Sequence, residues 1–147
     1  MFRNILIPTD GSDLSEKAGR CAVELARSTG AAITAFHVAP AYTFDVYEEY
    51  IPPGFERPAD YEARAEKVAQ THLGKIRKLA EAAGIRCEGH YAKSDFPADA
   101  ILQAVERYRC DSIFMGSHGR SGVSKLLLGS QTQKVLAAAN VPVVVIR

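Results

Sequence analysis

The chain has 147 residues, a length that suits one compact domain. Hydrophobic residues make up 47% and charged residues 24%, so the chain can bury a full core and is not expected to be disordered. The formal net charge is +1 and there is no basic run, which argues against non-specific binding to nucleic acid or to a membrane surface.

The start of the chain and its cysteines indicate the compartment. The apolar run from Ile5 to Ile7 is far too short for a signal-peptide core or a membrane span, so we expect a soluble protein of the cytoplasm. Cys21, Cys87 and Cys110 form no CxxC pair. We expect them to serve as small buried hydrophobic residues in a reducing compartment.

Apolar runs and helical periodicity alternate along the chain. This alternation implies an α/β fold with an open, doubly wound, five-stranded parallel sheet and helices on both faces. The less apolar third strand is expected near one edge of the sheet, and the last strand at an edge too. The predicted strands are 2–8, 31–39, 85–92, 111–115 and 141–147, the helices 13–28, 59–83, 94–108 and 130–139, and the long loops 40–58 and 116–129.

In open α/β sheets the ligand lies beyond the carboxyl ends of the strands. Three predicted segments lie at such ends: Pro8 to Ser12, His37 to Ala39, and the segment that starts at Met115. A ligand bound in this crevice is expected to touch all three.

The third segment is a glycine-rich loop. Gly116, Gly119 and Gly129 are expected to let the backbone approach a ligand closely and to adopt positive φ. The run Ser130-Gln131-Thr132-Gln133 has the form of a capping box, which predicts that a helix begins at Ser130 with this side chain as its cap. The N–H groups and partial positive charge of such a helix start suit phosphate oxygens.

Other interpretations of the loop are open at this point. Arg120 and Lys125 add positive charge near the helix start, or are simply solvated. The glycines alternatively serve only as turn formers. No Gly-Lys-Ser/Thr follows at the spacing of a Walker loop, and the first close pair of glycines of the dinucleotide fingerprint is missing.

The loop resembles the G-x2-G-x9-G-S/T nucleotide-binding signature of universal stress proteins, at Gly116, Gly119, Gly129 and Ser130. The start from Ile5 to Ser12 resembles the opening strand and turn of that family, and the end, Val141-Pro142-Val143-Val144-Val145, resembles its closing strand. The resemblance covers the chain as a single domain, residues 1–147, except for 40–58, which have no counterpart.

The resemblance implies an adenine nucleotide alpha hydrolase-like fold with strand order 3-2-1-4-5 that binds ATP or a related adenine nucleotide, with Mg²⁺ or Mn²⁺ on the phosphates. It implies that Asp10 lies near the ribose or phosphates and that Val38 contacts the adenine. The other implied contacts are Pro8 and Thr9 at the pocket wall, Met115 and Gly116 beneath the ribose, and Gly119, Gly129, Ser130 and the backbone of Gln131 around the phosphates. We add Arg120 to the nucleotide-binding residues for its positive charge beside them.

Gln131 departs from the family pattern, because ATP-binding members carry a small or β-branched residue there. If only its backbone N–H meets the phosphate, binding survives; if its side chain fills the pocket, affinity falls. Asp10 also has a simpler interpretation, as the cap of the turn or helix that follows.

The histidines suggest no catalytic or metal site. We interpret His118 as structural or solvent-facing and His37 as packed in the sheet, while the sequence identifies no partners for His72 and His90. No set of histidines and carboxylates has the spacing of metal ligands, and we assign no catalytic residue.

The resulting hypothesis is an ATP-binding stress-response protein that acts as a sensor or regulator. One alternative is slow ATP hydrolysis or nucleotidyl transfer using Asp10, His118 and Arg120; another is an interaction module whose protein partner is unknown. The apolar last strand, from Val141 to Arg147, is predicted to pair with a second copy in a homodimer, which would cover an exposed edge.

Overall fold

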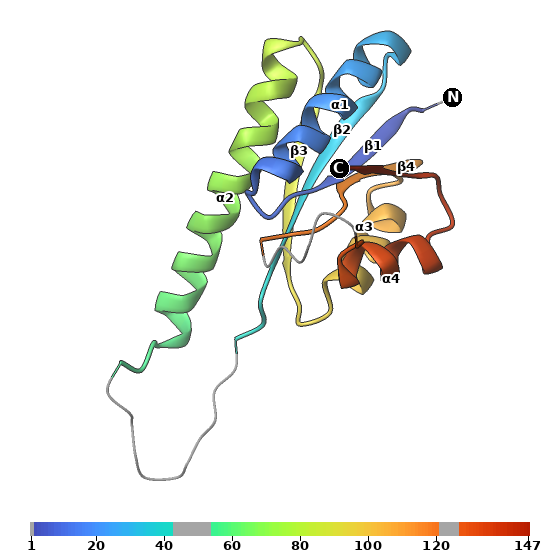
Figure 1. Cartoon of the computed structure of the whole chain (residues 1–147). Coiled ribbons are helices and arrows are strands. Elements are labelled where there is room, and N and C mark those ends of the chain that lie inside the picture. The colour runs from blue at the N-terminus through green and yellow to red at the C-terminus, as the bar shows by residue number, and fades with distance from the viewer. Residues whose placement is uncertain (1, 43–53, 121–126) are drawn as a thin grey trace.

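The computed structural model describes residues 2–42, 54–120 and 127–147. Its strands and helices alternate along the chain and form one parallel sheet of five strands within the described residues, in the order β3-β2-β1-β4-β5 (Figure 1). The predicted fold and strand order are confirmed, and β3 and β5 lie at the two edges. The elements are β1 (Asn4–Pro8), α1 (Asp13–Thr29), β2 (Ala32–Ala39), α2 (Pro58–Ala82), β3 (Cys87–Lys93), α3 (Pro97–Arg107), β4 (Ser112–Gly116), α4 (Ser130–Ala138) and β5 (Val143–Ile146).

The helices cover the two faces of the sheet in pairs, with α1 and α2 on one face and α3 and α4 on the other (Figure 1). Side chains of a strand alternate between its faces, so Ile5 and Ile7 pack under α1 and α2, whereas Leu6 packs under α3 and α4. Burying an aliphatic side chain of this size contributes about 1.5–3 kcal/mol. Both faces of β1 are buried, which explains its continuous apolar run.

The centre of the sheet fixes the place of the site. β1 pairs in parallel with β2 on one side, with Pro8 opposite Phe36, and with β4 on the other side, with Leu6 opposite Ile113. Strand order reverses at this point, so the helices after β1 and β4 leave on opposite faces. The carboxyl ends of β1, β2 and β4 therefore surround one crevice.

The start of α1 is fixed by a cap. Ser12 has extended backbone, and its side-chain oxygen accepts a hydrogen bond from the N–H of Ser15 at 3.2 Å. Ser12 is therefore the N-cap of α1, an interaction worth about 1 kcal/mol. At the other end Gly30, with φ of 74°, closes the helix in the left-handed conformation that glycine adopts without strain.

Several element boundaries differ from prediction. α3 begins at Pro97 rather than at residue 94, because proline suits the first helical position and the Ser94 N–H is still bonded to the Ala39 carbonyl. β5 begins at Val143 because Pro142 has no N–H to donate to a strand.

Cys110 is buried as predicted, but Cys21 and Cys87 are only half-buried, since they lie on the flank of α1 and on edge strand β3. Of the predicted long loop 40–58, the part from 43 to 53 lies outside the described residues. Among the described helices none combines the length and hydropathy that crossing a membrane requires.

Candidate functional site

A pocket of about 760 Å³ lies at the crevice between the ends of β1, β2 and β4. Its walls include the first turns of α3 and α4. A volume of this size suits a small organic ligand. The structure brings the whole predicted set of site residues to this one pocket: Pro8, Thr9, Asp10, Val38, Met115, Gly116, Gly119, Arg120, Gly129, Ser130 and Gln131.

Asp10 connects two loops at the rim of the pocket. Its Oδ1 accepts a hydrogen bond from the N–H of Ser12 at 3.0 Å, and its Oδ2 accepts one from the backbone N–H of Arg120, also at 3.0 Å. Burial raises the pKa of Asp10, but the hydrogen bonds from Ser12 and Arg120 outweigh it, so the net pKa lies below its ordinary value. The carboxylate is therefore held ionised and in place.

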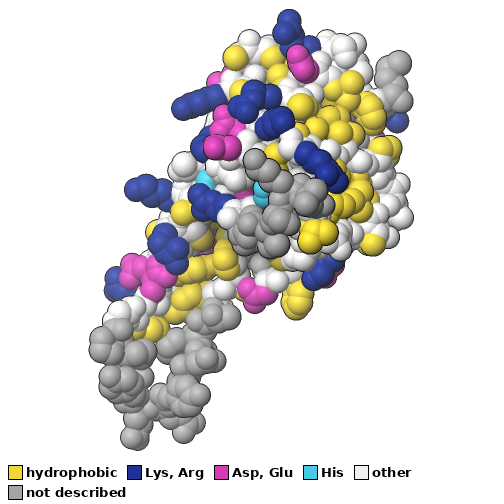
Figure 2. All heavy atoms as spheres, in the orientation of Figure 1, with side chains coloured by type: hydrophobic (Ala, Val, Ile, Leu, Met, Phe, Trp, Pro, Cys, Tyr) yellow, Lys and Arg dark blue, Asp and Glu magenta, His cyan; other side chains and the backbone are white. Residues whose placement is uncertain are grey.

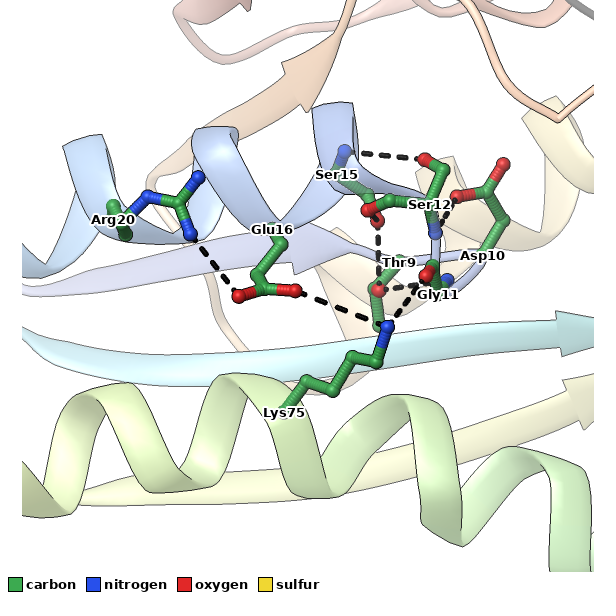
Figure 3. A network of polar contacts seen from close by, with 8 residues as sticks. All are labelled: Thr9, Asp10, Gly11, Ser12, Ser15, Glu16, Arg20 and Lys75. Atoms are coloured by element: carbon green, nitrogen blue, oxygen red, sulfur yellow. Dashed lines mark hydrogen bonds and ion pairs between the residues drawn. The ribbon is translucent and has the colours of Figure 1, made fainter.

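The turn that carries Asp10 is fixed by a small polar network (Figure 3). The buried Thr9 hydroxyl lies 3.1 Å from the Ser15 hydroxyl and accepts a hydrogen bond from the N–H of Gly11 at 3.2 Å. From the side of α2, Lys75 Nζ donates to the carbonyl of Gly11 at 2.9 Å. The turn is thus held both by Ser15 of α1 and by Lys75 of α2.

The signature glycines are required for close packing, and not for their φ angles. The prediction of positive φ is wrong for Gly116, Gly119 and Gly129, since the positive-φ glycines of the described residues lie elsewhere. A Cβ on Gly119 would lie 2.9 Å from Asp10 Oδ2, and one on Gly129 would lie 3.1 Å from the Cα of His118. These two glycines let the loop fold against the Asp10 turn and against itself.

The start of α4 faces the pocket. The predicted role of Ser130 as the cap is wrong: Gly129, with φ of −61° and ψ of 153°, is the N-cap, makes no side-chain hydrogen bond, and Ser130 is the first helical residue. The N-cap thus lies one residue earlier than predicted. The backbone N–H of Gly129 donates a hydrogen bond to the Ser117 carbonyl at 2.7 Å, which holds Gly129 at this position. The first N–H groups of a helix have no partner within it, so those of Ser130 and Gln131 are suited to bind an anion.

The side chain of Gln131 turns toward α3. Its Oε1 accepts a hydrogen bond from the backbone N–H of Ala98, in the first turn of α3, at 3.1 Å. Phe96, the residue at the N-cap of α3, makes no side-chain cap bond, so Gln131 supplies the missing acceptor. The amide therefore joins α4 to α3, and the backbone N–H of Gln131 remains at the pocket.

An apolar half of the pocket lies next to Val38, between β2, β4 and α3. Phe36, Pro97, Ile101 and Met115 line it together with Val38. Sequence reasoning missed Pro97 and Ile101, because no motif on α3 marks the residues that reach over the sheet. The one available signal was that Pro97 predicts a helix start near the carboxyl ends of the strands.

Polar residues that sequence reasoning did not assign also reach the pocket. Thr132 lines it, and its hydroxyl donates to the carbonyl of Gly116 at 3.0 Å. His118 lines the pocket as well, with Nδ1 3.1 Å from the Ser117 hydroxyl. Lys125 lies outside the described residues. Among the described side chains no group of three or more His, Cys, Asp or Glu is placed to hold a metal ion.

A second pocket, of about 410 Å³, lies between the end of β2 and α2. Tyr42, Tyr61 and Arg64 are among its lining residues, and it contains none of the predicted site residues. The predicted chemistry therefore concentrates in the larger pocket.

The model of the universal stress protein family matches residues 1–147. Universal stress protein MJ0531 of Methanocaldococcus jannaschii is 30% identical over 150 residues, which cover 100% of this chain and 83% of that protein. A universal stress protein of Thermus aquaticus is 35% identical over 151 residues, and the match covers 100% of both chains.

Solved structures have the same fold. The protein described as hypothetical protein MJ0577 superposes with a TM-score of 0.74 at 25% identity, covering 99% of this chain and 96% of that one. The universal stress protein of Archaeoglobus fulgidus in complex with dAMP gives a TM-score of 0.66 at 23% identity, covering 100% and 98%. A family protein of Arabidopsis thaliana with AMP bound gives 0.67 at 19% identity, covering 98% and 90%.

Proposed function

Because the chain belongs to the universal stress protein family, we propose that it binds an adenine nucleotide, ATP or a close relative, in the larger pocket. One observation carries the proposal: a single pocket has an apolar half, formed by side chains such as Val38 and Met115, and a helix N-terminus at its other half. The structural neighbours with dAMP and AMP support the adenine class.

The two chemically different halves of the pocket support an assignment of the parts of the nucleotide. The adenine lies against Val38 and Met115, since flat aromatic bases favour apolar walls. The phosphates meet the N–H groups of Ser130 and Gln131 at the start of α4, where the helix dipole favours negative charge. The ribose then lies between them, near Asp10, whose ionised carboxylate is suited to accept hydrogen bonds from its hydroxyl groups.

The remaining residues of the site have supporting roles. Pro8 and Thr9 line the wall, Gly116 passes beneath the ribose, and Gly119 with Gly129 lets the backbone approach the phosphates. Arg120 adds positive charge at the rim. Mg²⁺ or Mn²⁺ would come with the nucleotide, held by its phosphates and not by a protein cage, and would offset their negative charge.

The chemistry of the site favours a nucleotide-dependent sensor or regulator of the stress response, acting in the cytoplasm, over an enzyme. A general base works best with a pKa near the working pH, whereas the pKa of Asp10 is lowered and both its oxygens already accept hydrogen bonds. Arg120 and His118 are the other residues with ionisable side chains among the described residues that line the pocket, and the Nδ1 of His118 already contacts the Ser117 hydroxyl. Phosphoryl transfer needs a positioned nucleophile and more charge stabilisation than these three residues supply.

The exposed edge of β5 supports the proposal of a homodimer. Its four residues are all half-buried in the single chain, and among the described strands it pairs only with β4. Hydrophobic side chains gather on the surface over β4, β5 and α4 (Figure 2). Pairing with a second β5 across a two-fold axis covers this edge.

Extraction of the purified protein tests nucleotide binding directly. The protein is denatured and removed by centrifugation, and the supernatant, which contains any released ligand, is run on an anion-exchange column. We expect a peak of adenine nucleotide. For protein stripped of nucleotide, ATP at a hundred times its dissociation constant adds about 2.7 kcal/mol of stability, which raises the melting temperature by several degrees. Empty protein whose melting temperature ATP leaves unchanged contradicts the proposal.

A further inference from the structure

Two buried histidines lie behind the turn that carries Asp10. His37 comes from β2 and His72 from α2, and each is only 7% exposed. Their rings meet edge to face, with centroids 4.8 Å apart. Because side chains alternate along β2, Val38 faces the nucleotide pocket while His37 faces α2 on the opposite side of the sheet. The pair is therefore outside the pocket but next to its wall.

The hydrogen bonds of the pair fix where its protons lie. His37 Nδ1 is 2.8 Å from the carbonyl oxygen of Thr9, and a carbonyl only accepts, so this nitrogen carries the hydrogen. His72 Nδ1 lies 3.4 Å from the same nitrogen. Because His37 Nδ1 has no lone pair to offer, a hydrogen bond between the two nitrogens has His72 Nδ1 as the second acceptor of the hydrogen that His37 donates to Thr9, which places the hydrogen of a neutral His72 on Nε2.

The ring of His72 also supports Gly11 directly. Gly11 has φ of 78°, and a Cβ at this position would lie 2.3 Å from Cδ2 of His72. The glycine is thus required both by the backbone conformation and by the ring that fills the space beside it. Lys75 of the same helix donates to the Gly11 carbonyl (Figure 3). With His72, α2 therefore supports the turn at two points.

We propose that the His37–His72 pair positions the Thr9–Gly11 turn for nucleotide binding, and that uptake of a proton by His72 loosens the turn and weakens the affinity for nucleotide. This inference rests on the proposed function for its ligand. A proton on His72 Nδ1 would set two N–H groups against each other, so the rings must separate or His37 must release Thr9. In either case the turn loses a support.

The surroundings keep His72 neutral near pH 7. Its pKa is lowered first by burial and then by His37 of β2 and by Arg120 of the loop after β4. Lys75, on the same helix, acts in the same direction, and Asp10 of the turn opposes them. Glu16 of α1 lies 3.8 Å from Lys75 and partly offsets its charge. Protonation therefore takes place only below the ordinary histidine pKa of about 6.5.

ATP affinity measured by calorimetry at pH 8 and pH 5.5 tests the inference. The wild type is compared with His72→Asn, whose amide oxygen takes the place of the Nδ1 acceptor but does not titrate. The matched control is His90→Asn, which removes a histidine that stacks on Tyr108, away from the turn. Titration of ATP itself is common to all three proteins and cancels in the comparison.

Between the two pH values the affinity of the wild type and of His90→Asn should fall by roughly three- to tenfold more than that of His72→Asn, the loss expected for one hydrogen bond. Equal pH profiles for the wild type and His72→Asn would overturn the inference, and so would binding that tightens in acid only when His72 is present. In the second case the charge of His72, and not the position of the turn, would dominate.

A readout without ligand separates this inference from the proposed function. Nitrogen spectra of the histidine rings should show the hydrogen on Nδ1 of His37 and on Nε2 of His72 near pH 8. The amide signals of Asp10 and Gly11 should titrate with His72 and stop doing so in His72→Asn. If ATP fails to bind at pH 8, the proposed function fails. If ATP binds but the tautomers or the amide titration differ from this pattern, only the present inference fails.

Discussion

Asp10 Oδ2 accepts a hydrogen bond at 3.0 Å from the backbone N–H of Arg120, a residue 110 positions further along the chain. The bond joins the turn after β1 to the loop after β4, on the two sides of the point where strand order reverses. The rim of the pocket is thereby held in place before any ligand arrives, which lowers the ordering cost of binding.

Replacing Asp10 should weaken nucleotide binding. In Asp10→Ala the loop loses its tie through Arg120, and the ribose loses its acceptor. Hydrogen bonds to charged groups contribute about 1.5–3 kcal/mol, so the dissociation constant for ATP should rise about ten- to a hundredfold in calorimetric titration. Asp13→Ala, which removes an exposed carboxylate from the first turn of α1, serves as the control and should leave the affinity unchanged. An unchanged affinity in Asp10→Ala would exclude Asp10 from the site.

Asp10 should also contribute to stability in a pH-dependent way. Its pKa is lower in the folded protein than its ordinary value of 3.8, so the unfolded chain binds the proton more readily. The contribution is complete above pH 3.8 and is lost as the pH falls through the lower folded-state pKa. Urea unfolding at pH 7 and at pH 3 should show a larger loss for the wild type than for Asp10→Asn. Equal losses would show that the pKa of Asp10 is not lowered on folding.

Gly119→Ala tests the tight contact between the loop and the Asp10 turn. The new Cβ would lie 2.9 Å from Asp10 Oδ2, so the loop must move away and ATP affinity should fall at least tenfold. Gly74→Ala is a matched control, because that glycine lies inside α2 with open space around its Cβ position. It should bind ATP normally and gain about 0.5–1 kcal/mol of unfolding free energy, measured in urea. Normal ATP binding by Gly119→Ala would contradict the packing argument.

Gln131→Ala separates the structural role of the side chain from the role of the backbone. Loss of the bond to the Ala98 N–H should lower the free energy of unfolding by about 1 kcal/mol. ATP affinity should change less than threefold, since the N–H of Gln131 remains. Gln103→Ala, on the exposed side of α3, is the control for stability. A large loss of affinity would mean that the amide itself contacts the phosphates.

The C-terminal strand should determine the oligomeric state. A charge placed in it by Val145→Glu would face its own copy across the two-fold axis, and such a strand edge no longer pairs. Sedimentation at micromolar concentration should give a dimer for the wild type and a monomer for the variant. Val68→Glu, at a 37% exposed position of α2, should remain a dimer. A monomeric wild type would refute the proposal.

The sequence was sufficient for the sheet because its signal is local. The continuous apolar run at Ile5–Ile7 predicts a strand buried on both faces, and the alternation of strands with helices leaves few arrangements. Strand order came from the family resemblance. The predicted starts of α3 and β5 were less exact, because a single proline, Pro97 for α3 and Pro142 for β5, decides where each element begins.

The site was predicted where it depends on strand ends and glycine spacing, and missed where it depends on tertiary contact. Val38 was assigned, but Pro97 and Ile101 were not, because no local pattern states which side chains of α3 reach over the sheet. The cap at Gly129 depends on a backbone bond to Ser117. His72 had no visible partner in the sequence, since His37 lies 35 positions away.

The structure of the purified protein with ATP, determined by crystallography, tests the central claim most directly. The account predicts the adenine against Val38 and Met115 and the phosphates at the first turn of α4, within hydrogen-bond distance of the N–H groups of Ser130 and Gln131. Nucleotide bound elsewhere, for example in the smaller pocket beside Tyr61, or a larger pocket that stays empty at saturating ATP, would contradict it.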